Sequence, residues 1–177
     1  ILKENNFNIK KESKKANVLQ FLVNGDADVD AIYRLTSDKH VNFKKNQNYC
    51  IGPKVFAPTN SQSTIFDQQA FPLLYLPITV SFRFTDILRG IILKTVLDIH
   101  KMNLSFKSPV AFQARNPHNY MKDFESEVSM YIGVKKSINI LSNLKKCQRI
   151  DETTEKAYEA LSNEGIVKEE EVYSYKS

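Results

Sequence analysis

The chain has 177 residues, of which 42% are hydrophobic and 25% are charged. This composition is that of one globular domain, or of part of a larger one, and it excludes a disordered chain. No apolar run reaches the roughly 20 residues that a membrane-spanning helix needs, so we expect no transmembrane segment in this chain. Cys50 and Cys147 stand in no Cys/His spacing, which excludes the usual structural zinc site.

The net charge of +5 is unevenly distributed along the chain. Residues 151–177 hold eight acids and three lysines, a net charge of −5, so residues 1–150 carry +10. A basic body suits a phosphorylated ligand, and from charge alone it suits nucleic acid or an anionic membrane equally well. The chain has no arginine-rich run and no aromatic pattern of a nucleic-acid module, so we expect no nucleic-acid partner.

The first residues predict a sheet with long connections. Residues 1–15 are polar and lysine-rich, which predicts a frayed end or the tail of a helix. Residues 18–23 (VLQFLV) have the composition of a strand. Residues 53–67 contain two prolines and an Asn-Ser pair, which predicts a short strand followed by a loop.

The middle of the chain predicts a short helix, a strand and a long helix. Residues 67–74 predict a short helix capped by Asp67, and residues 74–84 (LYLPITVSFRF) predict a strand. Thr85 or Asp86 stands where the N-cap of the long helix is expected. The residues that recur there at helical spacing are Ile87, Leu88, Ile91, Ile92, Thr95, Val96 and Ile99.

The last third predicts mainly helices. Residues 104–114 (LSFKSPVAFQA) have the composition of one or two short strands. A long helix is expected from Asn119, with an interruption near Gly133. Another helix is expected from Asp151 to Asn163, followed by a frayed end. Strands that alternate with helices predict a layered α/β domain.

Three aspartates, Asp26, Asp28 and Asp30, follow the first predicted strand at alternate positions. Neighbouring carboxylates repel one another, and a divalent cation is the simplest reason to gather them. An EF-hand loop is excluded, because its sixth position is Ala31 instead of Gly and its twelfth is Ser37 instead of Glu.

A phosphotransfer pair of the haloacid-dehalogenase type is also disfavoured, because Asn24 and Gly25 separate the aspartates from the strand. The D-x-D pattern of nucleotide-sugar transferases fits better. Residues i and i+2 of an extended backbone point the same way, so Asp28 and Asp30 could converge on one ion. Diphosphate and water would complete its coordination. The alternative is a solvated, Asp-rich turn that begins at Gly25.

Four blocks of the sequence, in this order, resemble STELLO-type glycosyltransferases: NGDADVDAIYRLT, PTNSQSTIFD, LPITVSFRFTDILRG and QARNPHNYMKDFESE. The likeness spans roughly residues 18–135 and leaves the acidic tail outside. A fainter likeness to plant UDP-arabinopyranose mutases, the reversibly glycosylated polypeptides, rests on FRFTDILRG and ARNPHNYMKDFESEV. The mutases carry two successive acids where this chain has Thr85 and Asp86, so mutase chemistry has less support.

The resemblance implies an α/β, Rossmann-related layered domain of the GT-A type. Only the C-terminal half of such a domain is expected here, with the D-x-D motif and then helices, because just 25 residues precede Asp26. We therefore expect a polar segment at residues 1–17, a glycosyltransferase domain, incomplete at its N-terminal side, at 18–145, and an acidic helical tail at 146–177.

The resemblance also implies a set of metal ligands. Asp28 and Asp30 would bind Mn²⁺ or Mg²⁺, and Asp26 would assist them without binding the ion. His118 would complete the metal site, since a late histidine recurs in GT-A proteins and neutral imidazole is a competent ligand for Mn²⁺.

Asp86 falls on the conserved acid of the family pattern and is the candidate catalytic base, with an N-cap role as the alternative. Arg83 and Arg89 would bind diphosphate, or else form salt bridges with nearby acids. Arg115 and Asn119 would also contact substrate. Leu88 replaces the tryptophan that is usual in the family, which weakens the case for a stacking contact there.

The leading hypothesis is a metal-dependent glycosyltransferase domain that uses a nucleotide-sugar donor, a UDP-sugar in the first instance, and a glycan or protein acceptor. The alternative is a glycosyltransferase-like domain without catalysis that binds glycans or partner proteins. A hydrolase or mutase with the same metal site is a third possibility. The expected location is the Golgi or another secretory lumen if the parent is a eukaryotic type II membrane protein, and otherwise the cytoplasm.

Overall fold

Two parallel strands, β2 (Val18–Gly25) and β5 (Leu104–Gln113), form the centre of the fold. The computed structural model describes residues 9–11, 15–45, 48–57, 59–114 and 116–177. In this part of the chain the sheet has the order β1-β3-β5-β2-β4. The three outer strands, all paired antiparallel to their neighbours, are β1 (Ile9–Lys11), β3 (Tyr49–Ile51) and β4 (Thr64–Phe66).

The parallel pairing brings the carboxyl ends of β2 and β5 to the same edge, with Gly25 opposite Gln113. Gly25 has a φ of +84°, and a Cβ atom there would lie 2.6 Å from the carbonyl oxygen of Gln113. Only glycine tolerates both the left-handed backbone and this close approach. The chain therefore turns out of the sheet at Gly25 and enters the aspartate loop, residues 26–30.

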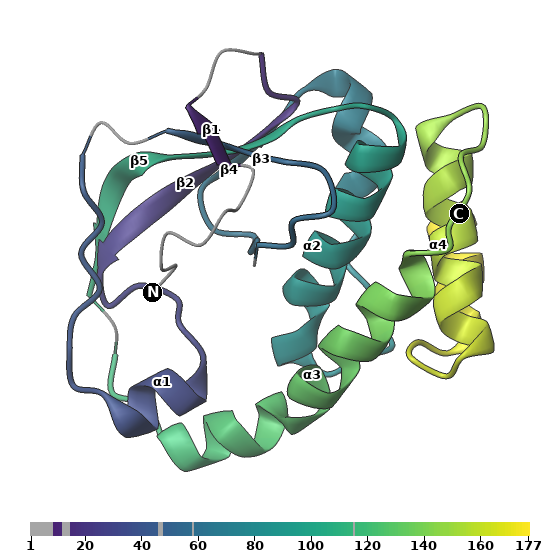
Figure 1. Cartoon of the computed structure of the whole chain (residues 1–177). Coiled ribbons are helices and arrows are strands. Elements are labelled where there is room, and N and C mark those ends of the chain that lie inside the picture. Colours follow the sequence, from purple (N-terminus) through teal and green to yellow (C-terminus); the bar gives the residue numbers. More distant parts are fainter. Residues whose placement is uncertain (1–8, 12–14, 46–47, 58, 115) are drawn as a thin grey trace.

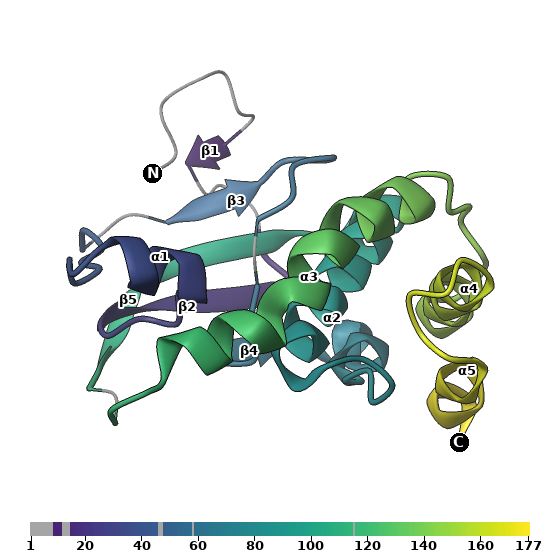
Figure 2. The same ribbon diagram turned by 90° about the horizontal axis from the view of Figure 1, so that it is seen from below.

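Helices cover the sheet and extend away from it (Figure 1). Figure 2 shows α2 and α3 next to the sheet, with α4 and α5 beyond these helices. The helices are α1 (Ala31–Thr36), the 3₁₀ helix η1 (Gln68–Leu74), α2 (Phe82–Ile99), α3 (Tyr120–Leu141), α4 (Ile150–Asn163) and α5 (Glu169–Lys176). The result is a mixed α/β fold. Within the described residues, none of these helices combines the length and apolar character needed to cross a bilayer.

Helix α2 is the centre of the hydrophobic core. Its residues from Leu88 to Leu97 are all buried, so the helix is enclosed on every side instead of along one stripe. One core joins α2 to the central strands through Val18 and Leu104 and to α4 through Tyr158. The sheet and the C-terminal helices thus share a single core.

Helix α3 runs through Gly133 without a break, so the predicted interruption there is wrong. A Cβ atom on Gly133 would lie 2.7 Å from the ring of Phe84 in α2. The glycine lets the two helices approach closely and does not end α3.

The predicted strand at residues 74–84 is also wrong. Leu74 ends η1, residues 75–81 are irregular, and α2 begins at Phe82. The predicted strand followed by a loop at 53–67 has the opposite order, because the loop comes first and β4 comes last. The short helix capped by Asp67 is confirmed as η1, and residues 104–113 form one strand.

The acidic C-terminal segment is part of the folded body. The helix predicted for residues 151–163 is confirmed as α4, but the chain then forms α5 instead of fraying. Glu171 of α5 is fully buried. Its carboxylate accepts hydrogen bonds from the Tyr75 hydroxyl (2.6 Å), from Ile78 N (3.0 Å) and from the backbone N (2.7 Å) and hydroxyl (2.6 Å) of Thr79.

These contacts explain why residues 75–79 do not form a strand. A buried charge must be paired or hydrogen-bonded, and here the irregular backbone supplies the donors. Burial, with Glu171 beside it, raises the pKa of Tyr75, which keeps its hydroxyl protonated as a donor. A single acid thereby anchors the segment that leads into α2.

Replacing Glu171 with alanine should lower the free energy of unfolding by about 2–4 kcal/mol, because several buried donors lose a charged acceptor. Glu170 is exposed on the same helix, and Glu170→Ala is the matched control, with an expected change within about 0.5 kcal/mol. Urea denaturation of the two variants measures the difference. Equal stabilities would show that the Glu171 contacts add nothing to the fold.

Candidate functional site

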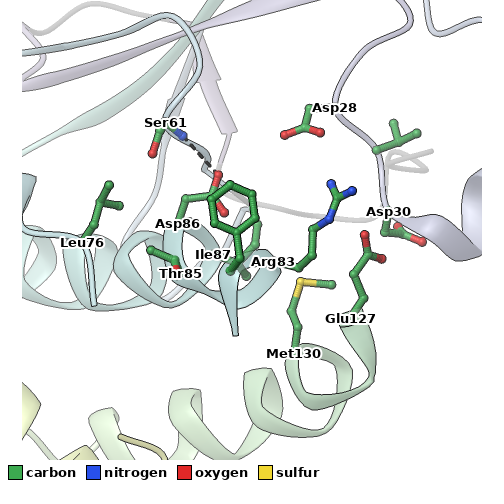
Figure 3. Close-up of a pocket in the computed structure, with 12 residues that line it drawn as sticks. Asp28, Asp30, Ser61, Leu76, Arg83, Thr85, Asp86, Ile87, Glu127 and Met130 are labelled. Atoms are coloured by element: carbon green, nitrogen blue, oxygen red, sulfur yellow. Dashed lines mark hydrogen bonds between the residues drawn. The ribbon is translucent and has the colours of Figure 1, made fainter. Parts of the chain in front are cut away.

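A pocket of about 380 Å³ opens between the aspartate loop, the start of α2 and the middle of α3. It lies by the edge of the sheet at which β2 and β5 end, where open α/β sheets commonly bind ligands. Its lining residues are Asp28, Val29, Asp30, Ser61, Leu76, Phe82, Arg83, Thr85, Asp86, Ile87, Glu127 and Met130. Figure 3 shows Asp28 and Asp30 on one side and Asp86 and Ser61 on the other.

Both members of the D-x-D pair line this pocket. Asp28 is exposed, and its Oδ2 accepts a weak hydrogen bond from the side chain of Asn60 at 3.4 Å. Asp30 is the N-cap of α1, and its Oδ1 accepts hydrogen bonds from Tyr33 N (3.0 Å) and from the Tyr131 hydroxyl (3.3 Å). Asp30 is therefore held by two neighbouring elements.

Asp26 belongs to a different environment. Its carboxylate lies 3.6 Å from the guanidinium of Arg34 and 3.3 Å from the ring of His40. Its backbone N donates to the carbonyl of Gln113 at 2.9 Å. Asp26 does not line the pocket and instead ties the loop to β5 and to α1.

Asp86 lies one turn into α2, on the same helix face as Phe82 four residues earlier. The prediction that Thr85 or Asp86 caps this helix is wrong, because Ser81 occupies the N-cap position. The Asp86 carboxylate accepts a hydrogen bond from Ser61 N at 3.3 Å. Burial raises its pKa, and the charge of Asp28 acts in the same direction. The hydrogen bond from Ser61 and the charge of Arg89 oppose this rise.

The two arginines that flank Asp86 in the sequence have different surroundings. Arg83 lines the pocket, and its Nη2 donates to Asp123 of α3 at 2.5 Å. Arg89 is only 5% exposed and donates to the carbonyl of Asn60 at 3.0 Å, with its guanidinium over the Phe66 ring. Arg89 is not among the pocket residues, so its charge acts on the site from beneath the loop at residues 59–62.

That loop depends on Gly90. A Cβ atom on Gly90 would lie 2.2 Å from the hydroxyl of Thr59, so the loop rests directly on the backbone of α2. The side chain of Gln20 also donates to Asn60 (3.2 Å) and to the carbonyl of Gln62 (2.5 Å). The position of the loop explains why Asn60 and Ser61 meet the two acids Asp28 and Asp86.

Two further residues of the predicted site, His118 and Asn119, do not line the pocket. His118 lies next to Asp123, with 3.4 Å between its Nδ1 and the carboxylate. Asn119 caps α3 by accepting from Lys122 N at 3.2 Å. Arg115 lies outside the described residues.

Among the described residues, no group of three or more His, Cys, Asp or Glu side chains is placed to hold a metal ion. Asp28 and Asp30 nevertheless supply the hard carboxylate oxygens that Mg²⁺ and Mn²⁺ prefer. These two residues fit an ion that takes most of its ligands from a diphosphate and from water. Within the part of the chain that the structure describes, they do not form a complete site by themselves.

Sequence reasoning missed several pocket residues, among them Glu127 and Phe82. Glu127 of α3 is 5% exposed, and Phe82 at the start of α2 is 89% exposed. Glu127 could have been found, because it stands on the apolar stripe of the predicted helix, three residues after Phe124 and four before Tyr131. An acid at such a position has to be paired. No sequence pattern indicated that Phe82 belongs to the site, because it lay within the strand predicted for residues 74–84.

Comparison with known protein families gives one finding. The model of the family described as STELLO glycosyltransferases matches residues 83–175, just over half of the chain. The match runs from the start of α2 to α5, so it includes the acidic tail that the sequence likeness left outside, and it begins after the aspartate loop. A comparison with curated proteins finds no match. The fainter likeness to the arabinopyranose mutases stays a prediction.

Replacing Asp86 with asparagine should stabilise the folded chain at pH 7 in the presence of a chelator. Because its pKa is raised in the fold, charged Asp86 costs stability above that folded-state pKa. This cost disappears when the pH falls below the pKa of an aspartate in the unfolded chain, which is about 3.9. The Tm of the variant should rise by about 2–4 °C for each kcal/mol by which the free energy of unfolding increases. This rise should become smaller as the pH falls towards 4.

Thermal unfolding between pH 4 and pH 8 tests this, with Asp38→Asn as the control because Asp38 is exposed and lies outside the pocket. A lower Tm for the Asp86 variant at every pH would mean that the charge stabilises the fold.

Proposed function

Because the chain belongs to the STELLO glycosyltransferase family, we propose that it is a metal-dependent transferase domain acting on a nucleotide-sugar donor, with a UDP-sugar as the first candidate. The acceptor is a glycan or a protein. One observation carries the proposal: Asp28, Asp30 and Asp86, from two distant segments, line one pocket together with Arg83. Acids placed this way match the two needs of sugar transfer, a cation site and a base.

The aspartate loop serves the donor. Asp28 and Asp30 would bind Mn²⁺ or Mg²⁺, and the bound cation would supply charge neutralisation for the departing diphosphate. Arg83 lines the same pocket and presents a guanidinium, which suits phosphate oxygens. Its pairing with Asp123 holds the guanidinium at the pocket wall.

Asp86 serves the acceptor. In a direct displacement, the acceptor oxygen forms a bond to the anomeric carbon while the bond from that carbon to the diphosphate breaks. The acceptor hydroxyl then loses its proton, and Asp86 is the candidate to accept it. Burial raises the pKa of this carboxyl, which makes it a better proton acceptor than an exposed aspartate. The amide of Ser61 orients it.

A second candidate function is a glycosyltransferase-like domain that binds a glycan or a partner without catalysis. It is favoured by the missing three-residue metal cluster among the described residues. The family match also begins after the D-x-D motif. The two candidates differ in one measurable property, because only a transferase needs nucleotide binding that depends on the metal.

UDP should bind more tightly with Mn²⁺ than without it, because two carboxylates alone hold the ion weakly and the diphosphate completes its coordination. The double variant Asp28→Asn/Asp30→Asn should lose this metal dependence. Calorimetric titration of UDP, with and without Mn²⁺, measures both. Asp38→Asn is the control and should behave as the unmodified chain does. Absence of any binding to the folded chain would favour the non-catalytic candidate.

Asp86→Asn should lower turnover by about 10²–10⁴-fold, the usual contribution of a positioned base. Asparagine keeps an oxygen that can accept from Ser61 N, so metal-dependent UDP binding should be largely retained. Release of UDP from a panel of UDP-sugars measures the turnover. Unchanged turnover in this variant would remove Asp86 from the mechanism.

A further inference from the structure

A buried acid of α3 contacts the exit of the aspartate loop. Glu127 is 5% exposed, and its Oε2 accepts hydrogen bonds from Ala31 N at 2.8 Å and from the Tyr131 hydroxyl at 2.6 Å. Ala31 is the first residue of α1 and directly follows Asp30. Figure 3 shows Glu127 of α3 close to Asp30 at the side of the pocket.

Tyr131 extends the same network to Asp30 itself. Its hydroxyl lies 3.3 Å from Oδ1 of Asp30, the oxygen that also accepts from Tyr33 N. Two side chains one turn apart on α3 thus contact both the carboxylate of Asp30 and the backbone that follows it.

These contacts are needed because α1, with only six residues, is too short to hold Asp30 in place by itself. Isolated helices of this length are unstable in water, so α1 takes its position from what it packs against. The described structure packs α1 on α3, which is part of the core (Figure 1). The place of Asp30 is therefore set from the core through Glu127 and Tyr131.

We propose that Glu127 and Tyr131 are positioning residues of the cation site, which hold Asp30 at the distance from Asp28 that a shared ion requires. The inference rests on the proposed function, since it assigns a role within that same site. It assigns no metal contact to Glu127, because the described residues contain no three-ligand cluster. Partners that orient metal ligands commonly change metal affinity about 10–100-fold when they are removed.

The first test uses the chain without ligands. Hydrogen exchange of the backbone amides of Ala31 and Tyr33 should be at least about 10-fold faster in Glu127→Ala than in the unmodified chain. Tyr131→Phe removes one hydroxyl and keeps the ring in place, so it should fold even if Glu127→Ala does not. In that variant the exchange of Tyr33 should rise, because Asp30 loses the second donor to Oδ1.

The second test measures UDP affinity with and without Mn²⁺. Tyr131→Phe should weaken the Mn²⁺-dependent binding by about 10-fold and leave the metal-free binding unchanged, a split that general destabilisation would not give. In an Asp30→Ala background, Tyr131→Phe should cause no further loss, because the side chain that Tyr131 contacts is absent there. Tyr173→Phe is the control, since Tyr173 is exposed on α5 and donates to Glu169.

The two tests distinguish a failure of the positioning role from a failure of the proposed function. Unchanged exchange at Ala31 and Tyr33, or additive losses in the double variant, would overturn the positioning role while metal-dependent binding stands. Faster exchange in a chain that never shows metal-dependent binding would overturn the proposed function, and the cation-site role with it.

Discussion

The parallel pairing of β2 with β5 is the constraint on which the site depends. Parallel strands need a long crossover, and here it contains α1, β3, β4, η1 and α2. Because both strands end at the same edge, the aspartate loop leaves the sheet where β5 stops at Gln113. The same crossover returns α2 beneath that edge with Asp86 near its start. One pairing thereby collects acids that are separated by more than fifty residues.

Gathering acids in one pocket has an electrostatic cost, and the surroundings limit it. Asp30 and Glu127 are satisfied by backbone amides and by a tyrosine hydroxyl, while the Asp86 carboxylate accepts from Ser61 N and feels the charge of Arg89. What remains is the mutual repulsion of Asp28 and Asp86, which helps to raise the pKa of Asp86. If a divalent cation binds beside Asp28 as proposed, it would reduce that repulsion and lower the pKa of Asp86.

Patterns among neighbouring residues were enough to predict α2 and η1. The α2 helix follows from its apolar spacing, and η1 follows from Asp67, which accepts from Ala70 N as a cap should. Residues 75–79 could not be predicted, because their backbone donors bind Glu171, 92 residues beyond Thr79. Gly133 was misread for a related reason: its role is the approach of Phe84 from another helix.

The site, like the fold, was predicted in part from the sequence. The D-x-D pair and Asp86 were identified from residue type, spacing and family likeness, and they do line one pocket. Arg89 was a candidate for binding diphosphate or for a salt bridge, and in the structure it is buried and contacts Asn60 and Phe66. The apolar stripe of the predicted helix indicates that Glu127 is buried, but it does not indicate the partner, because Ala31 lies 96 residues earlier.

The burial of Glu171 also sets an order of events during synthesis. A nascent chain emerges from the ribosome with its N-terminal part first. The three aspartates of the loop, Asp86 and the segment at residues 75–79 are therefore made long before the acid that anchors this segment. The pocket wall at Leu76 is completed only after residue 171 has been translated. A chain that stops between residues 145 and 171 would contain the acids of the site but would lack Glu171, which anchors the segment beside the pocket.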